Sequence, residues 1–244
     1  MFKNILIFAL SSFVIGNVVA WFSGAAPINF APIEYSQSEQ KQLNFLKSAV
    51  QRDEKDADAQ LALGQLYSYH HELELAQTHL SQALKVLPDL PLAQAAYYAN
   101  DGMLAGASVD LTMGIYKTLR LRTAMEKINE AASEAEQDFS VRLVRLVTFS
   151  YVGEYGGLFD QVFKDEIWFN QLFDQAGEQM PAQIKQTAWI ALAHVYLNQV
   201  STSPENLKQG TQYFAMATAL GACPNTLQYS CLQLGSVSLA SGGL

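Results

Sequence analysis

Residues 57–90, ADAQLALGQLYSYHHELELAQTHLSQALKVLPDL, decide the fold. In both halves of this stretch, apolar side chains recur three and four residues apart, which is the spacing of one helix face. Gly64 and Ala76 are small where two antiparallel helices would approach each other closely. Tyr67 and Leu80 would fill the space between those helices. The stretch therefore predicts a helical hairpin.

The same stretch resembles a tetratricopeptide repeat (TPR), a helix–turn–helix unit of about 34 residues. Gln60 stands where the family usually has Trp, and Pro88 ends the second helix because proline breaks helices. A second, weaker resemblance begins near Gln186 and contains an insertion around Ser201 to Pro204. The diagnostic residues are Leu63, Gly64, Tyr67, Ala76, Leu80, Ala83 and Pro88 in the first unit, and Leu192, Ala193, Tyr196, Gly210, Phe214 and Ala217 in the second.

Helical periodicity continues along the chain, and neither hairpin signals nor a strand-helix-strand rhythm interrupt it. The predicted helices lie at about 36–50, 57–70, 72–87, 91–104, 111–137, 139–152, 158–176, 181–199, 204–221 and 225–240. Residues 91–185 match the repeat poorly, since the segment at 111–137 exceeds a TPR helix in length. The predicted fold class is all-α, and the resemblance implies a TPR-like α-solenoid of antiparallel helical hairpins over residues 36–244.

The amino terminus has the features of an export signal. Lys3 gives a positive start, Ile5 to Ile15 is an apolar core, and Val18-Val19-Ala20 offers small side chains to signal peptidase. We expect residues 1–20 to be a signal peptide and the protein to be exported, either periplasmic or secreted.

An uncleaved anchor in the inner membrane is the alternative. No charge occurs from Asn4 to Ile33, and Trp21-Phe22 would suit a membrane interface. Residues 21–35 are rich in Pro, Ala, Ser and Gly and are predicted to be a linker. In either case, membrane contact is expected only through the N-terminal segment.

Charge and motifs exclude several function classes. The chain has 15 Lys and Arg against 23 Asp and Glu, a net charge of -8, and no basic stripe, so nucleic acid is not an expected partner. The sequence has no nucleophile elbow, P-loop or dinucleotide-binding turn. We therefore expect that the chain is not an enzyme and binds no cofactor. His70, His71 and His79 lack metal-site spacing and are expected to face solvent near an interhelical turn.

Cys223 and Cys231 are the two cysteines of the chain. An oxidising compartment favours a disulfide between them. If Pro224 opened a helix, the two Cα atoms would lie about 12 Å apart, too far for a bond. A disulfide requires the chain to turn at Pro224 so that Cys231 faces back, and two buried free thiols are the alternative.

The TPR resemblance implies a partner site on the inner face of the array, lined by the first helix of each unit. The corresponding positions are Asp58, Leu61, Gln65, Ser68 and Tyr69 in the first unit, and Thr187, Ile190, His194, Leu197 and Asn198 in the second. Leu61 and Gln65 depart from the pattern of members that clamp a terminal carboxylate. A peptide or partner helix that docks apolar side chains, with Tyr69 as an anchor, fits better. The alternative for Leu61 and Ile190 is packing between units.

These observations predict a protein-interaction scaffold or adaptor of the cell envelope. One alternative is an accessory subunit of a membrane transport or assembly complex, tethered by its N-terminal segment. Another is a helical hydrolase of cell-wall material, which would need two acidic side chains in a cleft.

Overall fold

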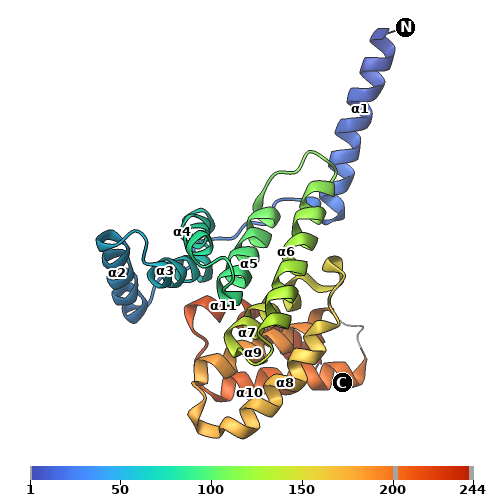
Figure 1. Ribbon diagram of the computed structural model, residues 1–244. Coiled ribbons are helices and arrows are strands. Elements are labelled where there is room, and N and C mark those ends of the chain that lie inside the picture. The colour runs from blue at the N-terminus through green and yellow to red at the C-terminus, as the bar shows by residue number, and fades with distance from the viewer. Residues whose placement is uncertain (1, 200–202, 242–244) are drawn as a thin grey trace.

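The computed structural model describes residues 2–199 and 203–241, and within these ranges the chain is all-α without a strand (Figure 1). This confirms that the chain is all-α, whereas the TPR-like solenoid stays a prediction. The α-helices are α1 (Phe2–Ala20), α2 (Gln37–Arg52), α3 (Ala57–Tyr69), α4 (Leu73–Val86), α5 (Pro91–Ala107), α6 (Ile115–Glu134), α7 (Phe139–Val152), α8 (Gln161–Ala176), α9 (Ala182–His194), α10 (Pro204–Ala219) and α11 (Asn225–Ser241). Short π or 3-10 helices are η1 (Trp21–Ala25), η2 (Gly153–Gly156), η3 (Gly177–Gln179) and η4 (Val195–Gln199).

The largest difference from the predicted helices is at the start of α6, which begins at Ile115 and not near residue 111. Asp110 accepts hydrogen bonds from the backbone N–H groups of Thr112 and Lys117 and so holds a turn. Met113 and Gly114 then adopt positive φ angles of 57° and 85°, which a helix does not allow. Part of the predicted insertion in the second unit, residues 201 and 202, lies outside the described residues.

Helices α2 to α5 share one apolar core. Ser36 and Glu39 form a capping box that starts α2, and Asp56 caps α3 through the Ala59 N–H. Gly64 lies where α3 meets α4, since a Cβ there would be 2.6 Å from Leu80 Cγ and 3.0 Å from its backbone nitrogen. The buried members of this core are Leu43, Leu46, Leu61, Leu63, Leu66, Tyr67, Ala76, Leu80, Ala83, Ala93 and Ala96.

The second half of the chain forms a larger core from α6 to α11. Met125, Phe149, Phe169 and Leu192 are among its fully buried side chains. At the contact of η4 with α10, a Cβ on Gly210 would lie 2.6 Å from Leu197 Cγ. In each predicted repeat unit, a glycine thus lies at a contact between two helices.

Helix α5 packs against both halves of the molecule, because the small alanine side chains on its faces allow close contact. Ala93 and Ala96 pack with α2 to α4, whereas Ala95 lies fully buried in a cluster with Ala131, Ala132 and Val141 of α6 and α7. Figure 1 shows α5 between the α2–α4 group and the lower helices. Helices α2 to α11 are therefore continuous in their packing.

Residues 26–35, within the predicted linker, run extended and are fastened to the helical body. The Ile28 N–H donates to Gly106 O, and the Ile33 N–H donates to His70 O, both at 3.0 Å. Tyr35 Oη donates to Glu72 Oε1 at 2.6 Å. We call this segment the strap.

The expectation that His70 faces solvent is wrong, because the strap covers this side chain. The His70 ring is fully buried, with Nδ1 2.9 Å from Ile33 O and its face stacked on Tyr35 at a centroid distance of 3.7 Å. His70 Nε2 lies 3.5 Å from Glu39 Oε1. The turn after α3 is covered by the strap, a contact that local sequence does not reveal.

Cys223 and Cys231 form a disulfide with a Cα–Cα distance of 6.6 Å. Helix α11 begins at Asn225, so Cys223 lies before the helix and the spacing along a helix axis does not apply to it. The chain turns at Pro224, whose carbonyl accepts a hydrogen bond from the Leu227 N–H. The bond ties the start of α11 to the turn that follows α10.

Helix α1 extends away from the rest of the molecule (Figure 1). Among the described residues, one helical stretch, Ile7–Ala25, is long and apolar enough to cross a bilayer, and 6% of it is buried. A signal sequence has the same properties, so this helix is compatible with a signal peptide or an anchor.

Candidate interaction site

Of the partner positions predicted on α3, some are accessible to solvent and one is buried. Tyr69 is 56% exposed and Asp58 is exposed, while Gln65 and Ser68 are half-buried. Leu61 instead is buried in the α2–α5 core. The accessible residues Asp58, Gln65, Ser68 and Tyr69, which we call the α3 stripe, form one mixed face of the helix.

The positions predicted in the second unit are mostly interior. Ile190, His194 and Leu197 are buried in the α6–α11 half, whereas Asn198 is exposed and Thr187 is half-buried. In this conformation, packing within the molecule occupies the three buried side chains. They do not form a surface continuous with the α3 stripe, because α3 belongs to the other core (Figure 1).

His194 shows what that interior position does. Burial lowers the pKa of His194 to about 4, so the ring is neutral at pH 7. Its Nδ1 lies 3.0 Å from Asn198 Nδ2, and its Nε2 lies 3.3 Å from Gln199 Nε2. Tyr151 packs against the ring at a centroid distance of 4.4 Å. These contacts support a structural role in joining α7 to η4.

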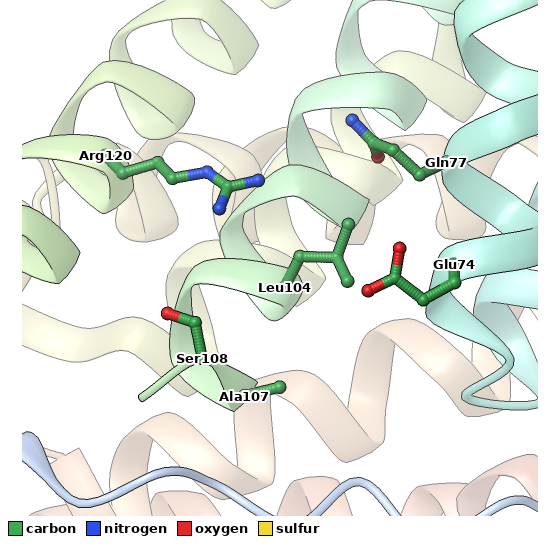
Figure 2. A pocket seen from close by; sticks show the side chains of 6 residues that line it. All are labelled: Glu74, Gln77, Leu104, Ala107, Ser108 and Arg120. Atoms are coloured by element: carbon green, nitrogen blue, oxygen red, sulfur yellow. The ribbon is translucent and has the colours of Figure 1, made fainter. Parts of the chain in front are cut away.

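The structure reveals a groove that the sequence did not indicate. It has a volume of about 390 Å³ and lies between α4, α5 and α6, lined by Glu74, Gln77, Leu104, Ala107, Ser108 and Arg120. Figure 2 shows Leu104 between Glu74 on one side and Arg120 on the other. We call it the α4–α6 groove; its volume falls within the range of ligand sites, about 300–1,000 Å³.

A hydrogen-bonded network fixes one wall of this groove. Arg120 binds Asp101 through two nitrogens, with Nε 3.1 Å from Oδ2, and this pairing raises the pKa of Arg120. Gln77 Nε2 lies 3.5 Å from Asp101 Oδ1, and Asn100 Nδ2 donates to Gln77 Oε1 at 2.8 Å. The positive charge of Arg120 is thus already matched by Asp101.

Glu74 is different, because its carboxylate makes no hydrogen bond or ion pair with any residue that the structure describes. Its side chain is exposed on the first turn of α4. Leu104 and Ala107 provide the apolar part of the lining. The groove therefore combines an apolar floor with one accessible negative charge, which suits an apolar segment that carries a cationic side chain.

Two acidic residues of α8, Asp165 and Glu166, are buried and engaged in internal contacts. Asp165 is fully buried and pairs with Arg145, whose Nη2 is 2.7 Å from Oδ1, and with Arg142 at 3.1 Å. Glu166 is also buried and accepts hydrogen bonds from Tyr196 Oη and Tyr213 Oη at 2.8 and 2.7 Å. Burial is the main cause that raises the pKa of both tyrosines, so they stay protonated donors.

These buried charges were not predicted, although the sequence contained a signal. Arg142 and Arg145 stand three residues apart in the apolar helix α7, and Asp165 and Glu166 interrupt the aromatic helix α8. A charge inside an apolar helix must pair with a partner when that face is buried. Here the pairs join α7 to α8 and α8 to α10.

Comparison with protein-family models, with curated proteins and with solved structures finds no match for this chain. Across the described ranges, no group of three or more His, Cys, Asp or Glu side chains is placed to hold a metal ion. The groove, the α3 stripe and the exposed helix α1 are the features of the molecule that point to a function.

Proposed function

We propose that this chain is a protein-interaction scaffold of the cell envelope, an array of TPR-like helical hairpins that holds a segment of another polypeptide. The open α4–α6 groove, with the accessible Glu74 carboxylate above an apolar floor, is the observation that carries the proposal. Such a surface favours a peptide with an apolar side chain next to a Lys or Arg.

The hairpin packing supports the TPR-like part of the proposal. Gly64 allows α3 and α4 to meet closely, and Gly210 does the same for η4 and α10. Stacked hairpins bury their apolar faces against the next hairpin and leave elongated surfaces for partners. Tyr69, at the end of the α3 stripe, is a suitable second anchor because it combines a large exposed area with a polar tip.

Site-specific photo-crosslinking in the cell of origin tests this function. A photoreactive amino acid placed at Gln77 or Leu104 is expected to give the same discrete adduct with one polypeptide. The matched control is Tyr229 on α11, which is 78% exposed and far along the chain from the groove. The adduct should disappear when Glu74→Lys is added, because the basic ligand then meets a positive charge.

Adducts of equal yield at Tyr229, or none at either groove position, would contradict the groove as the partner site. Tyr69→Ala tests the α3 stripe separately. A lower adduct yield would include the stripe in the site, whereas an unchanged yield would remove it.

Helix α1 favours a second candidate, an accessory subunit of a membrane transport or assembly complex that stays tethered. Its apolar surface is exposed over Ile5, Phe8, Leu10 and Ile15. Mass measurement of the mature N terminus separates the candidates. A chain that begins near residue 21 supports the exported form, and one that begins at Met1 and resists carbonate extraction supports the tethered form.

A further inference from the structure

We propose that the connection between α5 and α6 and the start of α6 form a second membrane contact, a lipid-facing surface beside the base of α1. We call it the loop patch. It consists of Val109, Leu111, Met113, Ile115, Tyr116 and Leu119, which are 47% to 63% exposed. Six large apolar side chains so close in sequence exceed the scattered exposure that is normal for a protein surface.

The loop patch is continuous with the helix that can cross a bilayer. The Met113 N–H donates to Asn17 Oδ1 of α1 at 3.2 Å, and Asn17 is itself buried. The Met113 side chain lies so near Gly16 that a Cβ there would be 2.7 Å from its Cε. Gly114 packs against Ala25 in the same way, with 3.0 Å between a Cβ at Gly114 and the Ala25 Cβ.

The length of the helix then sets the depth of the patch. The stretch that is apolar enough to cross a bilayer, Ile7–Ala25, includes Gly16, Asn17 and Ala25, which contact the loop. Its 19 residues cover about 28 Å at about 1.5 Å per residue, close to the hydrocarbon thickness of about 30 Å. If this stretch crosses the bilayer, its contacts with Met113 and Gly114 bring the loop into the lipid.

The charged groups of the loop are placed in a way that suits contact with a lipid surface. Asp110, its one acidic residue, is 3% exposed and turned inward, where it binds Thr112 and the Lys117 N–H. Of the three basic residues in 109–122, Arg120 is paired with Asp101 and Lys117 Nζ donates to Gly106 O, which leaves Arg122 as the exposed one. Arg122 is exposed next to the patch, where it would meet anionic headgroups.

These features identify lipid, and not another protein, as the occupant. An apolar surface with an exposed arginine at its edge, joined to a helix that is apolar enough to cross a bilayer, is typical of an interfacial segment. Asn17 and Met113 also satisfy each other at a depth where an unpaired amide would be costly. This rests on the tethered form, the second candidate above, and adds a membrane contact far from the N terminus.

Fluorescence quenching in lipid nanodiscs tests the patch on the full chain. Both native cysteines are in the disulfide, so single cysteines at Ile115 or Leu119 can be labelled with an environment-sensitive dye. The nanodiscs contain phosphatidylglycerol and phosphatidylcholine with brominated acyl chains. We expect loss of dye fluorescence at both positions, similar to that of a label at Phe8 in α1.

The matched control is Leu75→Cys on α4, which is 46% exposed and should keep its fluorescence. Quenching at Phe8 but not at Ile115 and Leu119 would overturn the proposal, because α1 would then span the bilayer without the loop. Absence of quenching at Phe8 would overturn it as well. Circular dichroism of each labelled variant confirms that the helices are intact.

Discussion

At the residue scale, the contact between Gly64 and Leu80 sets the approach of α3 and α4. The helix backbones are close enough that a methyl group at residue 64 would meet both the Leu80 side chain and its backbone nitrogen. A side chain can rotate away from such a group, but a backbone nitrogen cannot without moving α4. The hairpin is therefore sensitive to one added carbon atom.

Gly64→Ala should lower the free energy of unfolding. Overpacking costs about 1–3 kcal/mol, and the better helix propensity of Ala offsets at most about 1 kcal/mol. Chemical denaturation of the full chain in mild detergent measures the change. Gly235→Ala in α11 is the control, since its Cβ would lie 3.6 Å from Phe214 Cζ and should be neutral or stabilising. Equal stability of the two variants would argue against close packing at Gly64.

His194 should make stability depend on pH. Its pKa is about 4 in the folded chain and 6.5 as the ordinary value, so between these the unfolded chain binds more protons. The free energy of unfolding should therefore fall as pH drops from 6.5 to 4, by up to about 3 kcal/mol. Denaturation curves across this range measure the fall.

Carboxylates also titrate at the acidic end of this window, so the informative quantity is the difference between wild type and His194→Gln. The variant has no imidazole and should show a flatter pH profile. Parallel profiles for the two proteins would mean that His194 does not carry the dependence.

At the element scale, the strap holds the turn between α3 and α4 through Tyr35 and His70. Tyr35→Ala removes both the stacking on His70 and the hydrogen bond to Glu72, whereas Tyr35→Phe removes only the latter. We expect faster amide hydrogen exchange over residues 26–35 in both variants, with the larger effect in Tyr35→Ala. A hydrogen bond to a charged group contributes about 1.5–3 kcal/mol. Unchanged exchange in both would show that the strap does not depend on Tyr35.

The helices were largely predictable because each is long enough for its apolar face to repeat several times. The start of α6 was not, since Asp110 and the positive φ angles at Met113 and Gly114 depend on turn geometry. The strap and the buried His70 were also missed, because they depend on contacts between residues distant in sequence. For the same reason, the partner positions on α9 and η4 could be aligned to the repeat while three of them lie in the interior.

At the scale of the whole molecule, α5 connects two cores through a face of alanines. Ala95→Leu would add three carbon atoms to a fully buried contact with Ala131, Ala132 and Val141. Such overpacking costs about 1–3 kcal/mol. Because α5 belongs to both cores, hydrogen exchange should accelerate in α3 and α4 as well as in α6 and α7.

Ala182→Leu is the control, since Ala182 is exposed at the start of α9. It should leave exchange unchanged in all of these helices. An effect of Ala95→Leu that stops at α6 and α7 would mean that the α2–α4 group is stable without the rest of the molecule.

The chain order around the α4–α6 groove has one more consequence. Ser108 and Arg120, which line the groove, directly flank the loop patch in sequence, next to Val109 and Leu119. With the patch at the lipid surface, the groove would open just above the headgroups. The ligands best placed to enter it would then be the segments that membrane proteins expose where their chains leave the bilayer.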